Sequence, residues 1–583
     1  MKKIVLFISC LFCFVLTNAQ TPNFEWAKSI GGTSADVGKS IAVDALGNVY
    51  TTGYFAGTVD FDPGPGIFNL TTTNFSGFPD IFISKLDEFG NFLWAKNIGD
   101  TLGGGAGNSI ALDASGNVYC TGYFKGTVDF DPGGGIFNLI STTTNYGDIF
   151  ISKFDPSGNF FWATQMGGSG NDQGVDIELD ALGNVYTTGS FQVTADFEPG
   201  AGVFNLTSSA PVHPSFSQGN IFISKLDLNG NFVWAKSMVG TYSGAGNSIA
   251  VDALGSVYTT GQFQDTVDFD PGIGIVNLNT DSLCSDIFIS KLNVSGDFVW
   301  AKQVKHIGGT FYNYNYGNDI TLDTFDNVYT TGLFQGTADF DPGVGIVSLT
   351  AGGLYDMFIS KLDSSGNFLW VKSMEGTGII AGNSIVIDTT GGVYTTGQFQ
   401  YTIDFDPGLG TFNLTSAASD DLFISKLDSF GNFMWAKNMG GASTNVGNSI
   451  ALDAIGNVYT TGQFAGTTDF DPDFGTFDLT SAGSYDIFVL KLSQTPTGIN
   501  ETINSSNISI YPNPNNGTFN ISISSQFKNA SIEVYNSLGA LVFKQEIVNQ
   551  ENSIELLNQS NGLYFVKVMS ENKIVGMGKI VKQ

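Results

Sequence analysis

Apolar and polar residues alternate with a period of two in short segments along most of the chain. DIFISKFD at 148–155 is typical, and NFLWAK at 91–96 and NSIALD at 108–113 have the same character. Alternation of this kind, in segments rich in Ile, Val, Phe, Tyr and Trp, predicts half-buried β-strands rather than helices. The abundance of glycine, 74 residues, adds many turns to this picture. We therefore expect an all-β protein.

The strand-like segments return in a fixed order, and each repeat contains one tryptophan. A segment like NSIALD precedes one like GNVYCTGYF at 116–124, and an acidic stretch, a DIFISKFD-like segment and an NFLWAK-like segment follow. Joints such as DALGN at 44–48 share the form Asp-x-x-Gly-Asn, which suits tight hairpins. Each repeat therefore predicts a four-stranded meander with NSIALD innermost. The tryptophans are Trp26, Trp94, Trp162, Trp234, Trp300, Trp370 and Trp435.

Seven four-stranded repeats predict a seven-bladed β-propeller over residues 20–493. The array begins with an outermost-type segment, FEWAKSIGG at 24–32, and ends with a third-strand segment, DIFVLKLS at 486–493. We expect the first segment to complete the last blade, because an open array would leave unpaired strand edges. We also expect each Trp to pack its outer strand against the next blade, rather than to form a ring that stacks on ligands. The repeats resemble the bacterial SBBP propeller-repeat family, which implies the propeller fold but no single activity.

The repeat pattern ends after residue 493. Residues 494–507 are polar and predict a linker, and 508–583 predict a small immunoglobulin-like β-sandwich. YPNP at 511–514, NSLGALV at 536–542 and Gly-Leu-Tyr at 562–564 closely resemble the type A C-terminal sorting domain of the type IX secretion system. The resemblance implies a Bacteroidetes-type protein, with the secretion machinery as partner of 508–583, that is released or held at the cell surface. An ordinary immunoglobulin-like accessory domain is the alternative.

The N-terminus points to the same compartment. Residues 1–19 start with two lysines, continue with an apolar run and end in small residues, which predicts a cleaved signal peptide. A lipoprotein attached through Cys10 or Cys13 is the alternative. No later stretch has the ~20 apolar residues needed to span a bilayer, so a soluble, monomeric mature chain is expected. Only Cys120 and Cys284 remain in it, and no disulfide framework is expected.

A pair of acidic residues follows the second strand of every repeat, as in GTVDFDPGPG at 57–66. The net charge of −30 disfavours nucleic acid as a partner and favours cations. Two interpretations of the pairs stay open: a solvated acidic turn before Pro-Gly, and a calcium site with one ion per blade. No pair contains Asn in place of an acid, which favours a charge requirement. The candidate calcium ligands are Asp60, Asp62, Asp129, Asp131, Asp196, Glu198, Asp268, Asp270, Asp339, Asp341, Asp404, Asp406, Asp469 and Asp471.

Two longer loops, 208–220 and 305–318, break the repeat symmetry. The second contains Tyr312, Tyr314 and Tyr316, whose rings suit stacking on a sugar. The chain has two histidines, His213 and His306, in different repeats, which argues against a histidine metal cluster or a His-based triad. We therefore predict no catalytic residue and no cofactor apart from the calcium considered above.

The sequence favours a secreted or cell-surface, non-enzymatic propeller that binds a glycan or protein ligand, as a binding or adhesion module. Catalysis would need a few residues that one or two repeats have and the others lack. An extracellular hydrolase or lyase acting on polysaccharide, and a structural surface or matrix protein, are the alternatives.

Overall fold

The computed structural model describes residues 21–72, 79–99, 103–210, 219–240, 242–281, 284–308, 314–473, 475–494, 508–523, 530–536, 541–547, 549–557, 559–570 and 573–582. All elements in these residues are β-strands, so the described part of the chain contains no helix able to cross a membrane. The chain divides into two compact units, residues 1–495 and 496–583. The predicted signal peptide and most of the predicted linker, together with His213 and Tyr312, lie outside the described residues.

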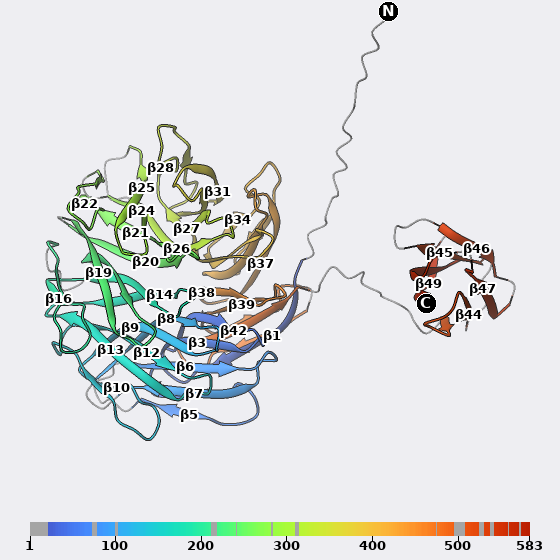
Figure 1. The fold of residues 1–583 in the computed structure, drawn as a ribbon, viewed down its shortest axis with the longest axis horizontal. Helices are drawn as coiled ribbons and strands as arrows, with labels where there is room; N and C mark the ends of the chain where they lie inside the picture. Colours follow the sequence, from blue (N-terminus) through green and yellow to red (C-terminus); the bar gives the residue numbers. More distant parts are fainter. Residues whose placement is uncertain are drawn as a thin grey trace, which may run out of the picture. The chain divides into compact units, whose positions relative to one another are not determined.

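The first unit is built from seven four-stranded antiparallel sheets, which are called blades and numbered along the chain (Figure 1). From the innermost to the outermost strand, blade one consists of β2 (Val37–Val43), β3 (Val49–Phe55), β6 (Asp80–Leu86) and β7 (Phe92–Ile98), and blade two of β8 (Gly104–Leu112), β9 (Val118–Lys125), β12 (Asp148–Phe154) and β13 (Phe160–Gly168). Blade three consists of β14 (Gln173–Leu179), β15 (Val185–Phe191), β18 (Asn220–Leu226) and β19 (Phe232–Gly240), and blade four of β20 (Gly244–Val251), β21 (Val257–Gln264), β24 (Ser285–Leu292) and β25 (Phe298–His306). Blade five consists of β26 (Tyr316–Leu322), β27 (Val328–Phe334), β30 (Asp356–Leu362) and β31 (Phe368–Gly376), and blade six of β32 (Ile380–Ile387), β33 (Val393–Phe399), β36 (Asp421–Leu427) and β37 (Phe433–Gly441). Blade seven consists of β38 (Asn445–Leu452), β39 (Val458–Phe464), β42 (Asp486–Ser493) and the N-terminal strand β1 (Asn23–Ile30).

The N-terminal strand completes the last blade, as the sequence predicts. β1 pairs antiparallel with β42, with Asn23 opposite Ser493 and Ile30 opposite Ile487. Ile30 is fully buried. The innermost strands also contact one another in cyclic order, and β38 of blade seven contacts β2 of blade one. The two ends of the repeat array are therefore joined both at the outer edge and at the centre.

Side chains at the centre link neighbouring blades. The innermost strand of blade one bulges between Gly38 and Ser40, and the other innermost strands bulge at the same place. In five blades the bulged residue is an Asn whose side-chain N–H bonds to a Gly carbonyl of the next blade. Blades one and three have Lys39 and Val175 there. The bonds are Asn108 to Gly174 at 2.8 Å, Asn247 to Gly317, Asn318 to Gly382 and Asn383 to Gly447 at 2.9 Å each, and Asn448 to Gly38 at 2.8 Å.

Each acidic stretch forms the start of a short hairpin that crosses to the preceding blade. In blade three, β16 pairs with β13 of blade two, so that Asp196 lies opposite Gly167 and the sheet grows to six strands. The sequence shows an acidic stretch here, but it does not show that the stretch pairs with a neighbouring blade. The hairpins are β4 (Thr58–Asp60) with β5 (Asn69–Thr71), β10 (Thr127–Asp129) with β11 (Asn138–Ile140), β16 (Thr194–Asp196) with β17 (Asn205–Thr207), β22 (Thr266–Asp268) with β23 (Asn277–Asn279), β28 (Thr337–Asp339) with β29 (Ser348–Thr350), β34 (Thr402–Asp404) with β35 (Asn413–Thr415), and β40 (Thr467–Asp469) with β41 (Asp478–Thr480).

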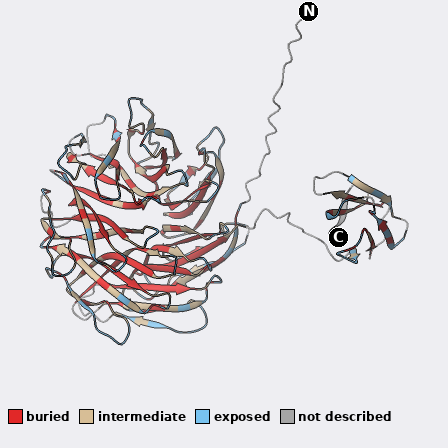
Figure 2. Cartoon of the chain, viewed as in Figure 1, coloured by how far each residue is buried: buried red, intermediate tan, exposed pale blue. Residues whose placement is uncertain are grey.

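The core runs through the blades and reaches under these hairpins (Figure 2). Phe61, between the two acids of the first pair, is fully buried and packs on Phe55 at 5.4 Å and on Phe82 at 5.2 Å between ring centroids. Its neighbours Asp60 and Asp62 are half-buried. Because residues two apart on an extended chain share a face, the burial of the Phe turns both carboxylates the other way.

The second unit contains two antiparallel sheets. Their facing side chains, among them Ile521, Ile532 and Val566, form one buried apolar cluster. The three-stranded sheet consists of β43 (Ile508–Tyr511), β44 (Thr518–Ile523) and β47 (Glu551–Glu555), and the four-stranded sheet of β46 (Leu541–Glu546), β45 (Ala530–Asn536), β48 (Gly562–Ser570) and β49 (Lys573–Lys582).

Candidate ligand site between blades five and six

The acidic pairs bind their own backbone. Asp60 Oδ1 accepts the N–H groups of Asp62 at 3.1 Å and of Phe68 at 2.8 Å, and Asp62 Oδ1 accepts the N–H of Gly64 at 2.8 Å. The first acid of every other pair accepts the equivalent two N–H groups. Each first carboxylate therefore closes the hairpin loop, a role that needs no ion.

The glycines of this stretch are explained by the same carboxylates. A Cβ on Gly66 would lie 2.1 Å from Asp62 Oδ2, and one on Gly135 would lie 2.0 Å from Asp131 Oδ2. The described residues hold no cluster of three or more His, Cys, Asp or Glu side chains suited to a metal ion. Calcium binding by the fourteen acidic residues stays a prediction, and each pair would need main-chain or water oxygens to complete a calcium shell.

The tyrosine loop is described only in part. Tyr314 and Tyr316 lie at the start of β26 with their rings parallel, at 6.3 Å between centroids. Burial, with smaller effects of Tyr355 and Tyr314, raises the pKa of Tyr316. The two rings stack on each other, and their use by a sugar stays a prediction. His306, at the end of β25, is buried.

One arrangement of Asp, Tyr, Lys and Trp side chains recurs in every blade, with an Asp–Lys ion pair in five of the seven. In blade five, Asp323 Oδ2 lies 3.4 Å from Lys361 Nζ and accepts the hydroxyl of Tyr329 at 3.2 Å. The Lys361 ammonium lies 4.6 Å from the centre of the Tyr329 ring. Trp370 meets that ring edge-on. The corresponding sets are Asp44, Tyr50, Lys85 and Trp94; Asp113, Tyr119, Lys153 and Trp162; Asp180, Tyr186, Lys225 and Trp234; Asp252, Tyr258, Lys291 and Trp300; Asp388, Tyr394, Lys426 and Trp435; and Asp453, Tyr459, Lys491 and Trp26.

The tryptophans join each blade to the next, as predicted. Trp370 Nε1 donates to the carbonyl of Ser429 in blade six at 3.3 Å, and Trp94 Nε1 donates to that of Pro156 in blade two at 3.1 Å. Trp162 and Trp435 are different: the Nε1 of each is buried and has no hydrogen-bond partner among the described residues. For Trp435, blade seven has no turn between its third and fourth strands to supply that carbonyl, because its fourth strand is β1.

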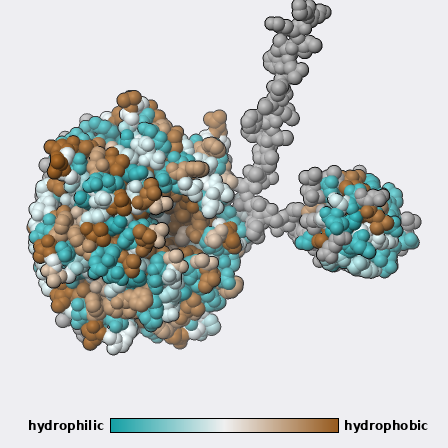
Figure 3. Space-filling view, in the orientation of Figure 1, coloured by the Kyte–Doolittle hydropathy of each residue, from teal (hydrophilic) through white to brown (hydrophobic). Residues whose placement is uncertain are grey.

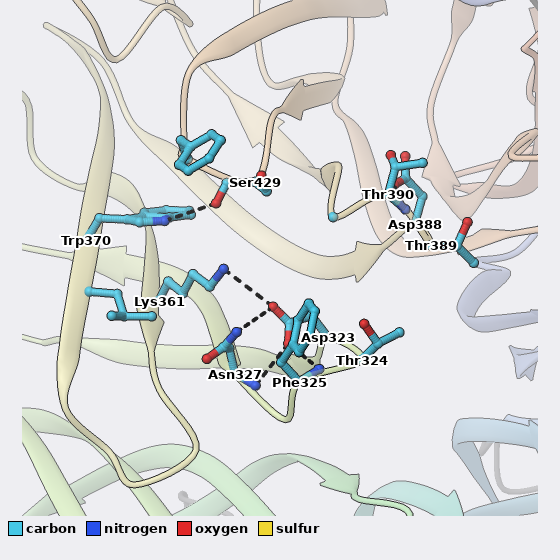
Figure 4. A pocket seen from close by; sticks show the side chains of 13 residues that line it. Asp323, Thr324, Phe325, Asn327, Lys361, Trp370, Asp388, Thr389, Thr390 and Ser429 are labelled. Carbon is cyan, nitrogen blue, oxygen red and sulfur yellow. Dashed lines mark hydrogen bonds and ion pairs between the residues drawn. The ribbon is translucent and has the colours of Figure 1, made fainter.

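A pocket of about 450 Å³ opens between blades five and six (Figure 4). Trp370, Lys361 and Asp323 of blade five line its inner part, and Figure 4 shows the Lys361 side chain reaching towards Asp323. Its rim carries Phe325 from blade five and Phe430 from blade six. These two rings are 79% and 75% exposed. The remaining lining residues are Thr324, Asn327, Leu369, Asp388, Thr389, Thr390, Gly391 and Ser429.

The two carboxylates of the pocket are held in the ionised form. Burial raises the pKa of Asp323, but hydrogen bonds from Asn327 and the charge of Lys361 outweigh it, so the pKa lies below the usual value. Burial also raises the pKa of Asp388, but the hydrogen bonds from the Thr390 hydroxyl and the Gly392 N–H, together with the Lys426 charge, outweigh it, so this pKa is lowered too. Lys426 Nζ lies 3.2 Å from Asp388 Oδ2. Each carboxylate thus has its own lysine, and the pocket is close to electroneutral.

This junction departs most from the repeat. The first turn of blade five reads DTFDN and that of blade six DTTGG, where blades one, three and seven have DALGN, DALGN and DAIGN. Asp326 replaces a glycine and keeps a left-handed φ of 59°. Strained backbone of this kind concentrates at functional sites. Among the described turns, this junction alone has exposed aromatic rings on both sides.

The sequence does not reveal this site, although part of the signal is present. Asp326 and Gly392 depart from the Asp-x-x-Gly-Asn turn pattern. Phe325 and Phe430 are about a hundred residues apart in the chain, and they line the same pocket only because the first turn of one blade lies near the last turn of the next. The order of the blades in the ring would have placed them together.

Two family models match parts of the chain. The model of the secretion system C-terminal sorting domain matches residues 509–583, and the SBBP β-propeller repeat matches residues 25–54. The chain therefore contains an SBBP β-propeller repeat and a type IX secretion C-terminal sorting domain. The sorting domain directs the propeller to the cell surface or the extracellular medium, and it implies interaction with the secretion machinery.

Two curated proteins are similar in sequence. The uncharacterized WD repeat-containing protein L264 of Acanthamoeba polyphaga mimivirus is 25% identical over 526 residues, which are 76% of this chain and 37% of the viral protein. The regulatory protein FlaEY of Caulobacter vibrioides is 27% identical over 164 residues, 28% of this chain and 16% of FlaEY. The matched regions thus span well under two thirds of either relative.

Several solved structures are distantly similar. They include the extracellular domain of the putative hybrid two-component system BT4673 of B. thetaiotaomicron, with 12% identity, 95% and 76% of the two chains covered and a TM-score of 0.20. PorZ of Porphyromonas gingivalis, described as a surface component of the type IX secretion system, has 12% identity, 96% and 100% coverage and a TM-score of 0.18. A fungal alcohol oxidase of the AA5 family has 10% identity, 97% and 100% coverage and a TM-score of 0.31. At these TM-scores the likenesses support no conclusion about this chain.

Proposed function

We propose that the seven blades form a closed propeller that acts outside the cell as a non-enzymatic binding or adhesion module, and that residues 508–583 form an immunoglobulin-like sandwich that serves export. The pocket between blades five and six carries the proposal. It is a concave site with an aromatic rim and a few polar groups, the usual composition of a ligand site. It also lies where the repeat symmetry is broken, which is where a specific site is expected.

The chemistry of the pocket supports binding rather than turnover. A general acid or base works best when its pKa lies near the working pH. Asp323 and Asp388 have lowered pKa values and are each bonded to several donors, so neither is suited to protonate a leaving group. The surface in view also mixes apolar and polar residues (Figure 3), which suits a protein exposed to water and binding through a local site.

The test uses the chain without residues 1–19 on an array of polysaccharides and extracellular proteins. We expect saturable binding to a subset of the array, with no change in the length of any bound polymer. Release of reducing ends would instead indicate a hydrolase, and appearance of unsaturated sugar ends would indicate a lyase. Absence of binding to every member would favour a structural surface or matrix role.

A further inference from the structure

We propose that the pocket between blades five and six binds a neutral carbohydrate chain, held between Phe325 and Phe430. This inference rests on the proposed binding function and names the class of ligand. The aromatic rim, the charge of the pocket and its exposed hydroxyl groups support it.

The rim presents two apolar rings to water in positions where most other blades have smaller side chains. The counterpart of Phe325 is Leu46 in blade one and Leu254 in blade four, and the counterpart of Phe430 is Ser157 in blade two and Ser365 in blade five. Aromatic rings bring large contact area with few rotatable bonds, so a flat ligand can be held between them at a low entropic cost. The C–H faces of a pyranose ring supply such a flat, weakly apolar surface.

The charges inside the pocket are already paired. Lys361 Nζ lies 3.4 Å from Asp323 Oδ2, and Lys426 Nζ lies 3.2 Å from Asp388 Oδ2. The remaining oxygen of Asp323 accepts the N–H groups of Phe325 and Asn327. A charged ligand would have to compete with these bonds and lose its own hydration without a free counter-charge. A neutral ligand avoids that desolvation cost.

Hydroxyl groups provide the polar part of recognition. Thr324 and Thr389 are exposed, line the pocket and replace the alanines of most other repeats. Thr390, also exposed, donates its hydroxyl to Asp388 Oδ1 at 2.6 Å, so its oxygen can still accept a bond from a ligand. Hydroxyls that both donate and accept match the hydroxyls of a sugar. The pocket volume of about 450 Å³ admits a short oligosaccharide segment.

The experiment measures binding of defined probes to the chain without residues 1–19. The neutral probes are gluco-, manno-, galacto- and xylo-oligosaccharides, and the charged probes are alginate and heparin fragments. Isothermal titration gives the Kd at 0.15 M and 0.5 M salt for the parent chain and for Phe325→Ala and Phe430→Ala. Phe89→Ala is the matched control, because Phe89 is 61% exposed on the equivalent turn of blade one, across from blade seven.

We expect at least one neutral probe to bind with a Kd that changes less than two-fold with salt. Phe325→Ala and Phe430→Ala should each weaken it more than ten-fold, whereas Phe89→Ala should change it less than two-fold. Circular dichroism and melting temperature confirm that the variants are folded. Neutral binding that survives both pocket variants, or that Phe89→Ala weakens equally, overturns the assigned site.

The remaining outcomes separate this inference from the binding function. Binding of charged probes only, with strong salt dependence, overturns the ligand class and leaves a binding module in place. Binding of array proteins without binding of any oligosaccharide also overturns the ligand class and leaves a binding module in place. A chain that binds no probe and no array member overturns both proposals.

Discussion

Asn448 in blade seven donates its side-chain N–H to the backbone carbonyl of Gly38 in blade one, at 2.8 Å. The two residues lie near opposite ends of the repeat array. The same bond joins blades five and six, where Asn318 donates to Gly382 at 2.9 Å. Across the closure the bond therefore has the same geometry as between blades that are joined by the chain.

Asn448→Ala should lower the free energy of unfolding as much as Asn318→Ala does. Each variant leaves a Gly carbonyl at the centre without its partner, at a cost of about 1–2 kcal/mol. Urea unfolding of both variants and of the parent chain measures the two losses. If the ring is open in solution, Asn448→Ala will cost almost nothing while Asn318→Ala keeps its full effect.

The acidic hairpins offer an internal comparison at adjacent glycines. A Cβ on Gly135 would lie 2.0 Å from Asp131 Oδ2, whereas a Cβ on Gly134 would meet nothing within 4 Å. Gly135→Ala should destabilise the protein by about 1–3 kcal/mol through this overlap, and Gly134→Ala should change its stability by less than about 0.5 kcal/mol. Chemical denaturation measures both. Equal effects of the two variants would show that the Asp131 carboxylate does not fix this glycine.

Period-two alternation and the Asp-x-x-Gly-Asn joints were enough to predict the four strands of each blade and the pairing of β1 with β42. These features are local, or depend on one unpaired edge. The crossing of β16 to β13 was not predicted, because a three-residue strand has no partner signature in its own sequence. In the sequence Asp196 and Glu198 stand out as a charged pair, but the fold depends equally on Phe197, which is buried between them.

The sequence does not reveal the candidate site for a similar reason. Each turn was visible in the sequence, but the pocket exists only where Phe325 of one blade faces Phe430 of the next. Turn patterns carry no information on which turns face each other, and the packing of the blades supplies it. The tyrosine loop is conspicuous in the sequence because it is long, but in its described part the rings of Tyr314 and Tyr316 stack on each other.

Buried carboxyl groups between blades should make stability fall as pH rises from the acidic range towards neutral. Burial raises the pKa of Asp172 from 3.8 to about 7, and Asp148 nearby adds to the effect. Because the folded pKa exceeds the unfolded one, the stabilisation is complete below pH 3.8 and is lost as pH rises towards about 7. Each such group changes the free energy of unfolding by about 1.4 kcal/mol per pH unit within that window.

Asp172→Asn tests this effect. Blade five has Asn315 at the equivalent position, where its Oδ1 accepts the N–H of Gln335 at 3.0 Å. Asp172 Oδ1 accepts the N–H of Gln192 in the same way, at 2.9 Å. The variant should therefore fold and should lose less stability than the parent between pH 5 and pH 8 in urea titrations. An unchanged difference between the two pH values would contradict the buried-proton explanation.

Calcium removal tests the remaining interpretation of the acidic pairs. Asp60 Oδ1 already accepts two backbone N–H groups, so the hairpins should keep their shape without an ion. We expect the melting temperature to be the same in 1 mM EDTA and in 1 mM calcium. A rise with calcium that disappears in Asp129→Asn would instead assign ions to the hairpins, and titration calorimetry would give their number.

The strained turn at the pocket gives the last prediction. Asp326 has a φ of 59°, and its counterparts Gly47 and Gly255 have φ values of 80° and 81°. A non-glycine residue in this region costs about 1–2 kcal/mol, and glycine gives part of that back through its greater freedom in the unfolded chain. Asp326→Gly should therefore stabilise the protein by about 0.5–1 kcal/mol in urea unfolding. If the strain shapes the turn that carries Phe325, the same variant will also weaken oligosaccharide binding. A variant that is neither more stable nor weaker in binding would show that Asp326 relieves its strain through a contact specific to this turn.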